Sequence, residues 1–180
     1  MRSDLHTPRS FVPLFLFAFA AAFVAVGCSH YAVREPAAPP LDPFATEART
    51  ATLAKVCVIK TTNLAHAMTF VSWDNGTLVG ATKGPTHFCY YAEPGEHDLL
   101  VDAHGVARTH YTAEAGKSYF VHEKVRFFGS PLAELTWVSA AEAERLFPSS
   151  SYAVLAAVPK DETLPQGIPL ARAKGSTSTR

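Results

Sequence analysis

The sequence predicts an all-β fold, a small antiparallel β-sandwich with one short helix near the C-terminus. Short segments rich in β-branched and aromatic residues recur about every ten residues from Ala54 to Val138, a spacing typical of sandwiches and barrels. Turn-forming residues separate these segments. The strongest hairpin signal is Asp74-Asn75-Gly76, because Asn-Gly tolerates positive φ at both central positions.

The individual strands follow from these turns. They are expected at Ala54–Lys60, Ala67–Trp73, Thr77–Lys83, Thr86–Ala92, His97–Ala103, Val106–Ala113, Lys117–Phe127 and Leu132–Val138. Successive residues of a strand face opposite sides of its sheet. In the longest strand this alternation directs one set of side chains to the core, namely Tyr119, Val121, Val125 and Phe127. It places Phe120 on the opposite, polar face together with His122.

A short helix is expected after the last of these strands. Ser139 followed three residues later by Glu142 is a capping box, and Pro148 ends the helix that the box begins. Beyond it, Tyr152–Val158 is apolar and is a candidate edge strand. The polar residues 159–180 are expected to be disordered.

The N-terminus has the features of a targeting signal. Arg2 and Arg9 precede an uncharged apolar run of 16 residues, Phe11–Val26. This run is shorter than the roughly 20 residues of a transmembrane helix and is typical of a signal peptide. The run ends in Ala25-Val26-Gly27-Cys28, which resembles the cleavage motif (lipobox) of bacterial lipoproteins.

That resemblance implies that residues 1–27 are removed and that Cys28 is lipidated. Two alternatives stay open, an uncleaved anchor and ordinary secretory cleavage nearby. Ser29, rather than Asp, follows the cysteine and favours the outer membrane, facing the periplasm. The expected mature chain then has a lipidated, flexible Pro/Ala tether at 28–51, a β-sandwich at 52–147 and a mostly disordered tail at 148–180.

Composition limits the partners. From Cys28 onward the chain has 14 Lys plus Arg and 15 Asp plus Glu, which gives a net charge of −1. Without a basic field, a nucleic-acid partner is not expected. The expected contacts are the membrane, through the lipid, and an envelope protein or a cell-wall glycan.

Two further cysteines remain, Cys57 and Cys89. An even pair in an oxidising compartment is compatible with a disulfide, and two reduced, buried thiols are an equal alternative, because the distance between the two cysteines cannot be read from sequence. A third interpretation is a nucleophilic pair of Cys89 with His87, because residues two apart in a strand share a face. Reactive thiols need an exposed, electropositive setting. The sequence therefore favours a buried or disulfide-bonded Cys89 over a nucleophilic one.

Three segments occur in a recognisable order: Ala54–Ile59, then Pro94-Gly95-Glu96-His97, then Ala113–Val121 with its Ala-Gly-Lys-Ser-Tyr-Phe run. Together with the signal, they resemble the bacterial family catalogued as domain of unknown function twenty-eight forty-six. The resemblance covers roughly residues 54–147. It implies a small all-β module on an envelope lipoprotein and brings no catalytic residues.

Catalytic and metal-binding patterns are weak. His97, His104, His110 and His122 lie near Asp98 and Asp102, but no close spacing typical of zinc ligands joins them. There is no Gly-x-Ser-x-Gly elbow. The sequence therefore predicts no catalytic residue, no metal site and no cofactor.

Exposed aromatic residues are the remaining candidates for a binding site. Strand alternation turns Phe120 and one ring of the Tyr90–Tyr91 pair outward, so Phe120, His122 and Tyr91 are the predicted partner-binding residues. The main hypothesis is a membrane-anchored, non-enzymatic binding or structural module of the cell envelope. The alternative is an envelope hydrolase or metal-dependent enzyme that uses the histidines of the β domain.

Overall fold

The computed structural model describes residues 31–38, 42–45 and 51–159. The predicted signal peptide, the lipidation site Cys28 and residues 160–180 of the expected disordered tail lie outside these ranges. Parts of the expected tether, at 28–30, 39–41 and 46–50, do so as well.

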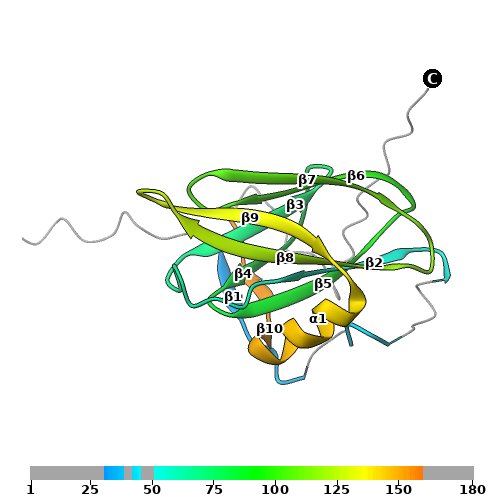
Figure 1. Cartoon of the computed structure of the whole chain (residues 1–180), viewed down its shortest axis with the longest axis horizontal. Helices are drawn as coiled ribbons and strands as arrows, with labels where there is room; N and C mark the ends of the chain where they lie inside the picture. The colour runs from blue at the N-terminus through cyan, green and yellow to red at the C-terminus, as the bar shows by residue number, and fades with distance from the viewer. Residues whose placement is uncertain (1–30, 39–41, 46–50, 160–180) are drawn as a thin grey trace, which may run out of the picture.

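The described chain is all-β with one short helix near the C-terminus, as predicted (Figure 1). Its strands are β1 (Ala32–Arg34), β2 (Ala54–Ile59), β3 (Thr69–Asp74), β4 (Thr77–Lys83), β5 (Thr86–Ala92), β6 (Gly95–Asp102), β7 (Val106–Ala113), β8 (Ser118–Phe127), β9 (Pro131–Val138), β10 (Ser151–Tyr152) and β11 (Val154–Ala157). The helix α1 (Ala140–Leu146) continues into a 3₁₀ turn, η2 (Phe147–Ser149). The predicted bounds of β4, β5 and β7 match the observed ones.

Two sheets form the sandwich. The larger has the order β10-β5-β2-β8-β9 and the smaller has the order β4-β3-β6-β7. Most neighbours are antiparallel, but β2 with β8 and β10 with β5 are parallel pairs. The parallel pair β2–β8 lies in the middle of the larger sheet and joins segments about sixty residues apart.

The main core lies between the sheets. It is built from the inward side chains of both, namely Val56, Val58, Val79, Phe88, Tyr90, Leu99, Tyr111 and Val121, with Tyr119, Leu135 and Trp137 packed against them. A second core lies on the other face of the larger sheet, where Leu146 and Phe147 cover Ile59 and Tyr152. Because the larger sheet is covered on both faces, every residue of β2 and β5 is buried.

The predicted turn and helix cap are both present. Asn75 and Gly76 have φ of 47° and 75°, the two positive values that the hairpin between β3 and β4 requires. At the start of α1, the Ser139 hydroxyl accepts a hydrogen bond from the backbone N–H of Glu142 at 3.2 Å. The helix ends before Pro148, as expected, and leaves Phe147 packed on the sheet.

The prediction that Phe127 faces the core is wrong. Its residue is 61 % exposed, and Val125 is only half-buried. The reason is strand length: β2 pairs with β8 only as far as His122, whereas β9 pairs with it to Phe127. The end of β8 therefore projects with β9 as a two-stranded hairpin, visible at the left of Figure 1.

The expectation that the tether contains no packed element is also wrong for its described residues. β1 pairs with β11, and the Tyr31 ring meets the Trp73 ring edge-on at 6.2 Å. Farther along, the buried Lys55 ammonium donates to the carbonyls of Asp42 at 2.8 Å and Ala45 at 2.6 Å. A buried ammonium needs acceptors, and the backbone carbonyls of this proline-rich segment supply them.

Candidate functional site

Two of the three predicted partner-binding residues are not accessible. Phe120 is 4 % exposed and Tyr91 is 1 % exposed. Alternation does place Phe120 away from the main core, but that face carries the second core. The Phe44 and Phe147 rings lie 5.5 and 6.0 Å from the Phe120 ring. The Phe120 ring, which was predicted to face outward, is therefore buried in the second core.

The histidines are dispersed. His122 is half-buried, with Nε2 3.2 Å from the Thr61 hydroxyl, and burial lowers its pKa, helped by the charge of Lys124. His97 lies in the main core, and His110 lies on the surface beside Asp98. Within the described ranges, no three His, Cys, Asp or Glu side chains are grouped closely enough to hold a metal ion.

The two core cysteines are bonded to each other. Cys57 and Cys89 face one another across β2 and β5, with Cα atoms 4.1 Å apart and an S–S bond of 2.05 Å. Cys89 therefore has no free thiol to serve as a nucleophile. His87 instead places Nδ1 2.9 Å from the Ser150 hydroxyl.

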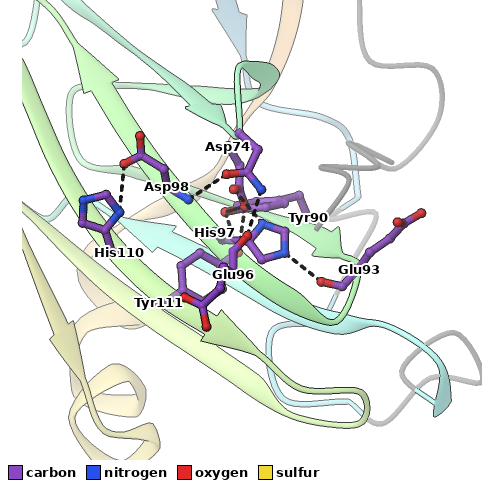
Figure 2. Close-up of polar contacts among 9 residues, drawn as sticks. Asp74, Tyr90, Glu93, Glu96, His97, Asp98, His110 and Tyr111 are labelled. Carbon is purple, nitrogen blue, oxygen red and sulfur yellow. Dashed lines mark hydrogen bonds and ion pairs between the residues drawn. The ribbon is translucent and has the colours of Figure 1, made fainter. Parts of the chain in front are cut away.

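A buried polar cluster lies between the sheets and centres on Asp74 (Figure 2). The hydroxyls of Tyr90 and Tyr111 each donate to Asp74 Oδ2 at 2.7 Å. His97 Nδ1 lies 2.8 Å from Asp74 Oδ1, and its Nε2 lies 2.7 Å from the Glu93 carbonyl. The side chains of Asp74 and His97 are both fully buried.

The hydrogen-bond partners in this cluster determine where the His97 ring is protonated. The Glu93 carbonyl can only accept, so His97 Nε2 carries a proton and donates to it; in the charged imidazole Nδ1 carries a second proton and donates to the Asp74 carboxylate. Burial opposes this charge, but the hydrogen bond and charge of Asp74 outweigh it and raise the pKa of His97. Burial also raises the pKa of Tyr90 and of Tyr111. The cluster links β3, β5, β6 and β7 through hydrogen bonds between buried side chains.

Sequence reasoning placed Asp74 in a turn and missed this cluster. The signal that points to it is strand parity, because Asp74 shares its face of β3 with Phe70, which is fully buried. A carboxylate with that parity needs buried donors. The identity of those donors depends on three other strands and is not encoded near Asp74.

A second buried polar group lies where β2 leaves the sheet. Lys60 donates to the carbonyls of Thr62 at 3.0 Å and Gly84 at 3.1 Å. Nearby, the fully buried Glu123 carboxyl accepts from the Thr82 hydroxyl at 2.9 Å. Burial raises the pKa of Glu123 to about 7 and lowers that of Lys60.

One open cleft combines apolar and polar groups and is the best candidate for a ligand site. It has a volume of about 500 Å³ and lies between the N-terminal segment and the outer face of the larger sheet. Its lining consists of Glu35, Pro36, Asp42, Pro43, Phe44, His87, Phe147 and Tyr152. Burial lowers the pKa of His87 to about 4, so its imidazole is neutral at pH 7.

Each polar side chain that lines the cleft can accept a hydrogen bond. These side chains are Glu35, Asp42, His87 and Tyr152. Asp42 Oδ1 already accepts from the backbone N–H groups of Phe44 and Ala45, at 2.8 and 3.3 Å, which shapes the segment into a turn. Glu35 adds a second carboxylate. The cleft therefore suits a ligand with apolar faces and several donors.

No family model, no curated protein and no solved structure matches this chain. Among the described residues, no helix has the length and apolar character needed to span a bilayer.

Proposed function

We propose that this protein is a lipid-anchored lipoprotein of the bacterial cell envelope, in which the sandwich is a non-enzymatic binding module. The anchor is Cys28, at the end of the signal-like run Phe11–Gly27. The Cys57–Cys89 bond supports the proposal, because structural disulfides persist in oxidising compartments such as the periplasm.

The cleft beside His87 is the proposed binding site. It replaces the predicted surface of Phe120, Tyr91 and His122, of which two residues are buried. The observation that carries the site is its combination of three aromatic rings with two carboxylates around one open space of about 500 Å³. Sugars present apolar C–H faces that pack on rings and hydroxyls that donate to carboxylates. The proposed ligand is therefore a cell-wall glycan.

The site is tested by photo-crosslinking in living cells. A photoreactive amino acid replaces Phe44, which is 42 % exposed within the cleft, or Ala115, which is exposed on the β7–β8 turn and serves as the matched control. We expect a glycan adduct from position 44, sensitive to muramidase digestion, and none from position 115. Equal adducts from both positions, or a muramidase-resistant protein adduct at 44, would contradict a glycan site in the cleft.

The anchor is tested separately by metabolic labelling with a clickable fatty acid. Wild-type protein is expected to incorporate the label and to sediment with membranes, whereas Cys28→Ala loses both properties. Labelling of Cys28→Ala at the wild-type level would refute the anchor.

A further inference from the structure

Four connections of the sandwich meet at one end of the molecule. They are residues 60–68 between β2 and β3, 84–85 between β4 and β5, 103–105 between β6 and β7, and 128–130 between β8 and β9. We call this set the loop end. The opposite end carries the connections 75–76, 93–94 and 114–117.

Direct contacts tie the four connections together. Lys60 donates to the carbonyls of Leu64 at 3.4 Å and Gly84 at 3.1 Å, which joins the first two. A Cβ on Gly105 would lie 2.7 Å from the side chain of Leu132, next to the last connection. A hollow of about 450 Å³ is lined by Met68 of the first connection, together with residues 103 and 104 of the third.

Exposed apolar side chains are concentrated at the loop end. Among the described residues, the large hydrophobic side chains that are exposed are Leu64 at 43 %, Val106 at 59 %, Phe127 at 61 %, Phe128 at 73 % and Phe44 at 42 %. All but Phe44 lie within the four connections or directly beside them. Phe127 and Phe128 form the tip of the projecting β8–β9 hairpin (Figure 1). Such an apolar group on a soluble domain marks a docking surface.

The loop end is also free of carboxylates in its connections. Residues 60–68, 84–85, 103–105 and 128–130 contain no Asp or Glu, and their one Lys or Arg, Lys60, is buried. The cations Lys83, Lys124 and Arg126 flank them, although Arg126 is paired with Glu134 and Asp102 directly precedes the third connection. At the opposite end, by contrast, Glu93, Glu114 and Lys117 occupy the turns. An apolar surface flanked by cations suits the negatively charged face of a bilayer.

The start of the described chain lies between the C-terminal half of β3 and the hollow that reaches the loop end. Tyr31 packs on Trp73 and lines the same hollow as Met68 and His104. Only Ser29 and His30 separate Tyr31 from Cys28, so their Cα atoms are at most about 11 Å apart. A lipid on Cys28 would thus hold this side of the sandwich close to the membrane. A fully flexible tether over 28–51, as expected from the sequence, would instead let the sandwich move away from the membrane.

We propose that the loop end docks on the bilayer that holds the lipid of Cys28, with Phe127 and Phe128 in the interfacial layer. This inference rests on the lipid anchor proposed above. Its occupant is the lipid surface itself, because Tyr31, three residues after Cys28, lines the hollow that reaches this end and because the apolar tip projects beyond the sandwich. The glycan cleft then opens from the side of a domain with a fixed orientation.

The test is fluorescence quenching with the lipidated full-length mature protein in vesicles of phosphatidylethanolamine and phosphatidylglycerol. Because Cys57 and Cys89 are bonded and Cys28 carries lipid, an introduced cysteine is the sole labelling site. Ser130→Cys places an environment-sensitive dye at the hairpin tip, and Ala115→Cys places it at the opposite end as the matched control. Spin-labelled lipids in the vesicles quench a dye that touches the bilayer.

We expect quenching several-fold stronger at position 130 than at position 115. Adding Phe128→Asp to Ser130→Cys should reduce that quenching while the protein still floats with the vesicles, which separates docking from anchoring. Equal quenching at both positions, in protein that is acylated and floats, overturns the docking surface alone. Protein that is neither acylated by mass nor floats overturns the anchor and the docking surface together.

Discussion

The carboxylate of Asp74 and the imidazole of His97 form a fully buried pair with 2.8 Å between Oδ1 and Nδ1. Two tyrosine hydroxyls donate to the same carboxylate, so four strands of the sandwich converge on one charge. A buried charge pair stabilises a fold only while both partners are present. Removing one partner leaves the other charge buried without compensation, which is strongly destabilising. Substitutions in this pair should therefore reduce the free energy of unfolding more than substitutions of surface ion pairs do.

Asp74→Asn is expected to reduce the free energy of unfolding by about 3 kcal/mol, because it leaves a buried imidazolium without its counter-charge. Urea denaturation followed by circular dichroism measures this change. Asp98→Asn is the matched control, since Asp98 pairs with Arg108 on the surface and such pairs contribute at most about 1 kcal/mol. Equal effects of the two substitutions would show that the buried pair has no special weight.

The pair also predicts how stability depends on pH. The pKa of His97 is raised in the folded protein, so folding binds a proton that the unfolded chain releases. The contribution of His97 is complete below its unfolded pKa of about 6.5 and is lost as pH rises through the higher folded value. Because Glu123 also titrates below about pH 7, unfolding is measured from pH 5.5 to pH 9 in a Glu123→Gln background, which should show this decline, and adding His97→Gln should remove it. A decline that persists in the Glu123→Gln, His97→Gln double variant would contradict the assignment to His97.

Glu123 predicts a gain in stability on mutation. Burial raises its pKa to about 7, so the wild-type protein loses stability as pH rises from the unfolded value to about 7. Glu123→Gln keeps an acceptor for Thr82 and removes this titration. It should stabilise the protein at pH 8 by on the order of 3 kcal/mol and leave stability at pH 4 nearly unchanged. Thermal melts at the two pH values give the comparison, and a variant less stable at pH 8 would show that the ionised carboxylate is needed.

The Cys57–Cys89 bond should contribute roughly 3–4 kcal/mol, the chain-entropy value for a separation of 32 residues. Wild-type protein unfolded without reductant should show no free thiol from this pair. Reductant should lower its unfolding midpoint. The Cys57→Ala, Cys89→Ala double variant controls for reductant alone and should not respond to it. Two free thiols in the non-reduced wild-type protein would contradict the bond.

Local patterns in the sequence were sufficient for strands β2 to β9, the Asn75-Gly76 turn and the Ser139 cap. Each of these depends on residues within a few positions of one another. Strand alternation depends on successive Cβ atoms, and the turn depends on two φ angles, both set by short-range sterics. In β8 the same local reasoning directed Tyr119 and Val121 to the main core, where they lie.

Long-range packing decided the rest. Alternation correctly turned Phe120 away from the main core, but whether that face meets water depends on α1 and on Phe44, which is distant in sequence. The proline-rich segment lacks any local reason to pack, and it is held by the ammonium of Lys55 and by β11. The donors of Asp74 likewise come from three other strands. Burial and charge pairing are properties of the assembled sheets, so only the tertiary structure assigned the ligand cleft, the buried cluster and the apolar loop end.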